Sequence, residues 1–107
     1  MIRAVCIGEC MVELRRSASG GLIHGFAGDA YNTAVYLKRS APEIDVQFLT
    51  AVGDDSFSHD MRAAWAAEGV GDTYAFTAPR KLPGLYLIET DAAGERQFHY
   101  WRSESAA

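Results

Sequence analysis

The feature of the sequence that most restricts its fold is the order in which short apolar runs and helical patterns follow one another. The first apolar run, residues 4–7, is continuous and ends at Gly8, as is typical of a strand buried on both faces of a parallel sheet. The elements that follow are a helix from Asp29 to the residues before Pro42, a strand at 46–52, a helix from Phe57 that ends at Gly69, and a strand at 73–76. This order predicts an α/β fold in which crossover helices connect parallel strands.

Two further stretches have strand patterns that do not belong to this alternation. Residues 11–26 are two half-exposed apolar segments around a Ser- and Gly-rich turn, and residues 84–102 are two strand-like segments around the turn 91–95. Each stretch predicts a β-hairpin. The alternation of a strand places Phe98, Tyr100 and Arg102 on one face of the second hairpin.

Charge and composition limit the kinds of partner. The formal net charge is -4, and no basic cluster exceeds a pair of residues, which argues against a nucleic-acid surface. No apolar run is long enough for a membrane span, and the first residues lack the apolar core of a secretory leader. These observations predict a cytoplasmic protein that binds neither nucleic acid nor a membrane. Cys6 and Cys10 are four residues apart, which fits neither a redox pair nor a zinc site, so we expect them to be small buried residues.

The strongest candidate for a binding site is the start of the first predicted helix. Gly28 would let a ligand approach the backbone, and the helix N-terminus offers free N–H groups. Asp29 and Asn32 are three residues apart and can share a face there, so a polyhydroxylated ligand would find acceptors and donors together. The alternative is that Asp29 only caps its helix.

Other candidates lie on the two hairpins. Glu13 lies on the first hairpin, although a single exposed glutamate is usually just solvated. Tyr86, Tyr100 and Arg102 lie on the second, where the fork of Arg102 suits a carboxylate ligand. The alternative is that Tyr100 and Arg102 form an ordinary surface pair.

The sequence contains no established phosphate-binding loop. Neither G-x-x-x-x-G-K-[ST] nor G-x-G-x-x-G occurs, and the histidines have no metal-ligand spacing. Residues 69–72 read Gly-Val-Gly-Asp but follow a helix, whereas a phosphate-binding turn opens one. We therefore expect this segment to terminate the second helix.

Several of these segments, in this order, resemble the ribokinase-like (phosphofructokinase-B type) sugar kinases, and within them the subgroup that acts on 2-keto-3-deoxygluconate. The similar segments are Cys6–Leu14, Gly28–Leu37, Thr50–Ser58, Gly84–Thr90 and Phe98–Ala107. The resemblance implies a Rossmann-like α/β domain with a small β-lid over the sugar. Residues 1–107 would be the N-terminal segment of that domain, with lid strands at about 11–26 and 84–102.

The resemblance also implies roles for the candidate residues. Glu13 matches an acidic position that contacts sugar, and Gly28, Asp29 and Asn32 match a substrate motif. Tyr86, Tyr100 and Arg102 match positions that contact a keto-sugar acid. One departure is Ala27, where the family usually has a second glycine, so ligand contact through this residue is in doubt.

The same resemblance implies a reaction that this segment would not complete by itself. The family transfers phosphate from ATP with Mg²⁺, and its catalytic base and ATP site belong to a downstream part that follows a second signature. We therefore expect this chain to bind the sugar acid, to contain no catalytic residue, and to be inactive alone. The resemblance implies homo-oligomers through the lid strands. The alternatives are a fructokinase- or ribokinase-type enzyme, or a non-catalytic module whose lid strands pair with another chain.

Overall fold

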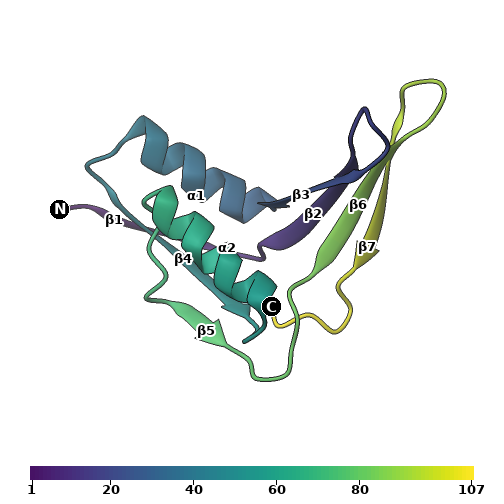
Figure 1. Cartoon of the computed structure of the whole chain (residues 1–107). Coiled ribbons are helices and arrows are strands. Elements are labelled where there is room, and N and C mark those ends of the chain that lie inside the picture. The colour runs from purple at the N-terminus through teal and green to yellow at the C-terminus, as the bar shows by residue number, and fades with distance from the viewer.

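The computed structural model describes residues 1–107 and arranges them in two β-sheets and two helices (Figure 1). The elements are, in chain order, β1 (Arg3–Ile7), β2 (Met11–Arg16), β3 (Leu22–Ala27), α1 (Asp29–Ser40), β4 (Asp45–Val52), α2 (Ser56–Ala67), β5 (Ala75–Thr77), β6 (Leu85–Thr90) and β7 (Arg96–Trp101).

The first sheet has the strand order β1-β4-β5, and all its strands are parallel, as the alternation of elements predicts. Both helices pack on the face of β4 that carries Val46, Phe48 and Val52, which are at most 1% exposed. The other face is uncovered, so Val5 and Ile7 of β1 are 43% and 70% exposed. The prediction of a first strand buried on both faces is therefore wrong, because both helices cover the same side of the sheet.

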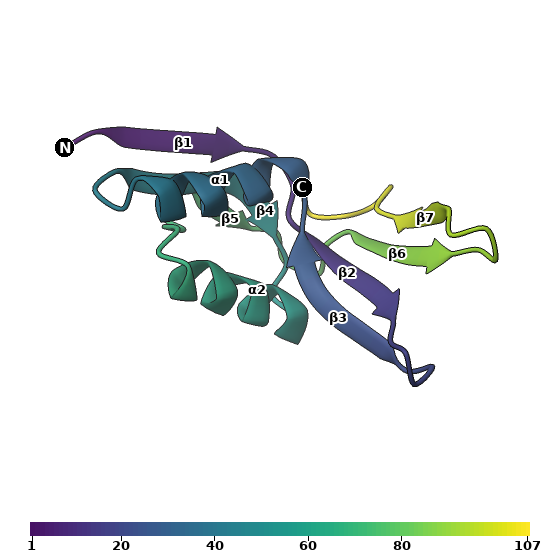
Figure 2. The same cartoon turned by 90° about the horizontal axis from the view of Figure 1, so that it is seen from above.

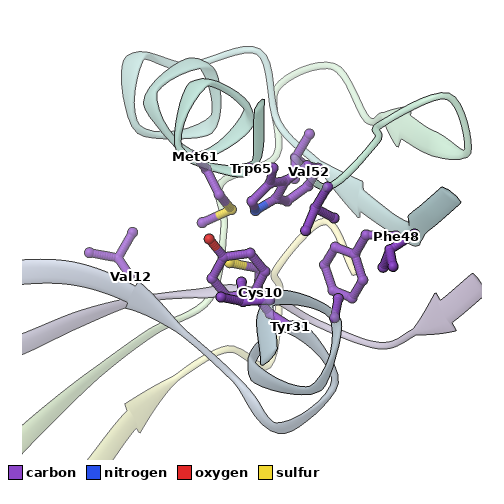
Figure 3. Packing of buried hydrophobic residues seen from close by; sticks show 11 residues of the cluster. Cys10, Val12, Tyr31, Phe48, Val52, Met61 and Trp65 are labelled. Atoms are coloured by element: carbon purple, nitrogen blue, oxygen red, sulfur yellow. The ribbon is translucent and has the colours of Figure 1, made fainter. Parts of the chain in front are cut away.

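The core between this sheet and the helices is built around Trp65 of α2. Trp65, Phe48 and Met61 are completely buried, and the rings of Phe48 and Trp65 meet edge to face with centroids 5.2 Å apart (Figure 3). Tyr31 of α1 packs against both rings. Phe57, where the sequence predicts the second helix to begin, lies in the first turn of α2 and is 47% exposed.

The ends of the helices show which residues act as caps. Gly28 is the N-cap of α1 and Asp29 is its first residue, whose side chain caps nothing, so the alternative reading of Asp29 as an N-cap is wrong. Asp55 caps α2 by accepting from the Ser58 backbone N–H. Gly69, with φ of 76°, ends α2, which confirms the expected role of the segment 69–72.

Neither helix is long and apolar enough to cross a membrane.

The second sheet has the order β3-β2-β6-β7 and contains both predicted hairpins. Its two central strands, β2 and β6, are parallel and join the hairpins into one sheet. Most of this sheet extends away from the helices (Figure 2), although Val12 of β2 belongs to the core cluster and the ring of His24 in β3 lies 6.4 Å from that of Phe57 in α2. As a result every residue of β7 is exposed.

The two cysteines behave as the sequence predicts. Both are free, Cys10 is buried in the core cluster and Cys6 is half-buried beside it. Burial raises the pKa of the Cys10 thiol to about 12, so this thiol stays protonated at neutral pH.

Candidate functional site

A cavity of about 480 Å³ lies where the two sheets meet, between the start of α1 and one face of β6 and β7. Six of the seven predicted site residues line it: Gly28, Asp29, Asn32, Tyr86, Tyr100 and Arg102. The structure therefore brings together residues that are up to 74 positions apart, from Gly28 to Arg102. The seventh, Glu13, does not line the cavity.

The start of α1 forms one side of the cavity because Gly28 allows a close backbone approach. Gly28 has φ of 157° and ψ of 150°, a conformation that only glycine adopts readily. A Cβ at this position would lie 2.4 Å from the backbone oxygen of Glu9. The side chains of Asp29 and Asn32 make no hydrogen bond within the chain, so both are available to a ligand.

The opposite side is an aromatic wall that ends in a guanidinium group. The ring of Tyr86 lies 5.7 Å from that of Tyr100 and 6.2 Å from that of Phe98, centroid to centroid. The Arg102 guanidinium carbon lies 5.0 Å from the Tyr100 ring centroid, within the range of a cation–π contact. Arg102 forms no ion pair within the chain, and it is the only lysine or arginine that lines the cavity.

Glu13 lies next to Tyr86 on the neighbouring strand β2 and does not line the cavity. Its carboxylate accepts a hydrogen bond from the Tyr86 hydroxyl. Burial, and then this hydrogen bond, raise the pKa of the Tyr86 phenol well above its ordinary value of 10.0. Tyr86 therefore keeps its proton, and the proton is directed toward Glu13.

The sequence analysis missed one charged residue of the cavity, Glu9. Its carboxylate lines the cavity and accepts a hydrogen bond of 2.8 Å from the Ser105 hydroxyl. Gly84 makes room for this carboxylate, because a Cβ there would lie 2.5 Å from a Glu9 oxygen and 3.1 Å from the Cβ of Arg102. The sequence did contain a signal for Glu9, because this residue directly follows Gly8 at the end of the first strand, in the same segment as the candidate Glu13.

The chemistry of the cavity suits an organic ligand with several hydroxyl groups and one negative charge. Glu9 and Asp29 offer acceptor oxygens, Asn32 offers both a donor and an acceptor, and Arg102 offers up to five N–H donors. No group of three or more His, Cys, Asp or Glu side chains is placed to hold a metal ion.

A larger cavity, of about 690 Å³, lies on the other face of the second sheet. Five leucines and Trp101 line it together with charged and hydroxyl side chains at one side, and Arg102 is the only predicted site residue among them. We assign the candidate site to the smaller cavity, because a polar ligand needs the converging polar groups that are found there.

Comparisons with known proteins show which family the chain is similar to. A model of the pfkB family of carbohydrate kinases matches residues 1–107. A 2-dehydro-3-deoxygluconokinase of Dickeya dadantii is 52% identical over 103 residues, and one of Escherichia coli K12 is 47% identical over 103 residues. Each alignment covers 94% of this chain and 33% of the relative, so the chain spans about a third of the length of these proteins. A fructokinase of Klebsiella pneumoniae is 30% identical over 100 residues, which is 94% of this chain and 32% of that protein.

Solved structures share the fold. The structure of 2-dehydro-3-deoxygluconokinase from Thermotoga maritima superposes with a TM-score of 0.88 at 20% identity, over 99% of this chain and 34% of that one. Fructokinase from Xylella fastidiosa gives a TM-score of 0.84 at 23% identity, over 97% of this chain and 33% of that one. Because the family model matches the whole chain and relatives of 41–52% identity align with nearly all of it, the chain belongs to the pfkB family of carbohydrate kinases.

Proposed function

We propose that this chain is the sugar-binding part of a kinase that transfers phosphate from ATP to 2-keto-3-deoxygluconate, the compound also called 2-dehydro-3-deoxygluconate. Relatives at 41–52% identity carry the corresponding name. The observation that carries the proposal is the single cation of the cavity. Arg102 has no carboxylate partner within the chain, so its guanidinium is free for the carboxylate of a sugar acid.

Each residue around the cavity would bind a different part of the ligand. Arg102 would bind the carboxylate through two parallel hydrogen bonds, and the Tyr100 ring beneath it would keep the guanidinium in place. Asp29 and Asn32 would bind hydroxyl groups at the start of α1, and Gly28 would let the sugar approach the backbone. Tyr86 would contact the ligand while its hydroxyl is hydrogen-bonded to Glu13. None of these residues is placed in a catalytic role.

The ATP and Mg²⁺ of the proposed reaction do not fit the residues of this chain. The sequence has no phosphate-binding loop, and no acidic cluster is placed to hold the metal. When bound, Mg²⁺ neutralises charge on the transferring phosphate. We propose that other parts of the enzyme bind both, and that the 107-residue chain has no kinase activity alone. ATP turnover by the purified chain would contradict this part of the proposal.

The second sheet is the proposed lid of the site and the proposed contact between two copies. It forms the aromatic wall of the cavity, and its outer strand β7 is exposed along its whole length. Leu22 and Trp101 are 58% and 59% exposed on the face that turns away from the cavity. Pairing of two lids would cover such side chains. We place the enzyme in the cytoplasm, where its proposed substrates are found.

A second candidate is a fructokinase, since the relative from Klebsiella pneumoniae carries that name. Fructose has no carboxylate, so it would leave the Arg102 guanidinium without a partner. The two candidates therefore differ in what they require of Arg102.

The deciding experiment is coupled ATP-to-ADP turnover by the full-length reading frame that carries this chain, with 2-keto-3-deoxygluconate, fructose and ribose. Arg102→Ala is compared with Arg96→Ala, which removes an exposed arginine at the start of β7, the strand that Arg102 follows, outside the cavity. A charge-assisted bond of about 1.5–3 kcal/mol corresponds to a loss of about 10- to 100-fold in kcat/KM. We expect this loss for Arg102→Ala with the sugar acid, and none for Arg96→Ala. Turnover of fructose that is insensitive to Arg102→Ala would favour the fructokinase.

A further inference from the structure

Glu13 and Tyr86 form a hydrogen-bonded pair of which only Tyr86 lines the cavity. They lie directly opposite each other on the parallel strands β2 and β6. The Tyr86 hydroxyl donates a hydrogen bond to the Glu13 carboxylate. Tyr86 is 8% exposed and lines the cavity, whereas Glu13 does not line it. The hydrogen bond to Tyr86 therefore connects Glu13 with the cavity.

This hydrogen bond determines what the Tyr86 oxygen can offer to a ligand. A phenol has one proton to donate and lone pairs that accept. Because the proton is directed to Glu13, only the lone pairs remain for the cavity. Such an oxygen accepts a hydrogen bond from a ligand hydroxyl and repels a ligand carboxylate. A carboxylate acceptor also makes the bond stronger than one between two neutral groups.

The cavity consequently differs between its two ends. At one end the Tyr86 oxygen, backed by the negative charge of Glu13, can only accept. Along the aromatic wall the Tyr86 ring is followed by the Tyr100 ring, 5.7 Å away, and then by the Arg102 guanidinium, 5.0 Å from the Tyr100 centroid. A guanidinium can only donate. A ligand with a carboxylate and hydroxyl groups therefore has one favourable orientation along this wall.

We propose that Glu13 is a positioning residue that fixes this orientation. It holds the Tyr86 proton away from the cavity, so that the Tyr86 oxygen accepts from a sugar hydroxyl and the sugar carboxylate is directed to Arg102. The identity of the ligand rests on the proposed function, whereas the pairing of Glu13 with Tyr86 does not. Glu13 thus acts through Tyr86 and does not contact the sugar itself.

The first test observes the pair without any ligand. Tyrosines labelled with ¹³C at the ring carbon that bears the hydroxyl report the hydrogen bond of each phenol by NMR at neutral pH. The full-length enzyme is used, and the Tyr86 signal is the one absent from Tyr86→Phe. We expect Glu13→Ala to shift this signal and to leave the other tyrosine signals in place. Glu13→Gln, which keeps an acceptor oxygen, should shift it less. A Tyr86 signal that does not move in Glu13→Ala would overturn the proposal.

The second test measures kcat/KM for the sugar acid in a double-mutant cycle. In the parent enzyme Glu13→Ala is expected to lower kcat/KM about tenfold, with partial recovery in Glu13→Gln. In the Tyr86→Phe background the same Glu13→Ala change should alter kcat/KM less than twofold, because the phenol through which Glu13 acts is absent. An equal loss in both backgrounds would overturn the proposal, since Glu13 would then contact the sugar directly.

The two tests separate this inference from the proposed function. A parent enzyme that phosphorylates no sugar acid would refute the proposed function. The labelled tyrosine signal would still decide whether Glu13 holds the Tyr86 proton.

Discussion

The two sheets of this chain are stabilised in different ways. The sheet of β1, β4 and β5 shares a close-packed core with α1 and α2, in which Trp65, Phe48 and Met61 are inaccessible to solvent. The sheet of β3, β2, β6 and β7 reaches this core through Val12 of β2, and its outer strand β7 is exposed along its whole length. The first region therefore depends on the burial of large side chains, and the second depends mainly on backbone pairing and a few side-chain contacts.

The comparison shows why the candidate site lies between the regions. The well-packed region supplies a fixed helix start, with Gly28, Asp29 and Asn32. The less buried region supplies the aromatic wall and Arg102, which are accessible because no helix covers them. A binding site needs both properties, namely groups held in place and a surface that a ligand can reach.

The largest difference in the free energy of unfolding should come from replacing one tryptophan of each region with alanine. Trp65→Ala removes a completely buried side chain and should lower the free energy of unfolding by about 3–5 kcal/mol. Trp101→Ala removes a side chain that is 59% exposed on β7 and should cost about 0.5 kcal/mol. Urea denaturation followed by circular dichroism measures both. Similar losses for the two variants would show that the second sheet has a core of its own.

Replacing one glycine in each region with alanine should have effects of intermediate size on stability. Gly28→Ala forces a side chain into a conformation that only glycine adopts readily and brings its Cβ to 2.4 Å from Glu9, so we expect a loss of about 1–3 kcal/mol. Gly94→Ala, in the turn between β6 and β7, has φ of 81° and open space around it, so about 1 kcal/mol is expected. Thermal unfolding checks the difference. Equal shifts in Tm would mean that the contact at Gly28 relaxes freely.

The third prediction concerns alkaline pH. Burial raises the pKa of Cys10 and of Tyr31 to about 12, from ordinary values of 9.0 and 10.0. These groups stay protonated in the folded state and ionise once the chain unfolds, so their stabilisation is complete below about pH 9 and is lost as the pH rises toward 12. Each proton contributes a slope of at most about 1.4 kcal/mol per pH unit. Tyr31→Phe should reduce the slope between pH 10 and 12, and an unchanged slope would contradict this assignment.

The smallest expected effect comes from a contact that joins the segment after β7 to the connection between β1 and β2. Ser105→Ala removes the hydrogen bond to Glu9 and should cost about 1 kcal/mol. Ser103→Ala, at an exposed position whose side chain makes no hydrogen bond, is the matched control. Equilibrium unfolding of both variants measures the difference. If both variants have the stability of the parent, Ser105 does not contribute to fixing the two regions together.

The sequence predicted most of the elements, because the apolar patterns of strands and helices are local. It did not predict that Val5 and Ile7 would be exposed, since periodicity shows which residues share a face but not whether another layer covers that face. It likewise did not predict that Phe57 would be 47% exposed, because the residues of α2 in the core cluster, Met61 and Trp65, begin one turn later.

The site was predicted less completely than the fold. The cavity gathers six of the seven candidates, and their binding roles stay predictions. Glu9 was missed because its place depends on the space left by Gly84 and on Ser105, contacts between distant parts of the chain. The position of Glu13 next to Tyr86 depends on the parallel pairing of β2 with β6, which strand patterns alone do not specify.

That parallel pairing has a consequence for synthesis on the ribosome. Glu13 and Tyr86 are 73 residues apart, and both helices and two strands of the first sheet, β4 and β5, lie between them in the chain. At about 5–20 residues per second, about 4–15 s pass between the synthesis of the two. During this interval β2 is paired with β3 on one edge only, and its other edge is open to strands of neighbouring nascent chains. The candidate cavity is therefore completed only after β6 and β7 are made, and until then the strand that carries Glu13 keeps one edge unpaired.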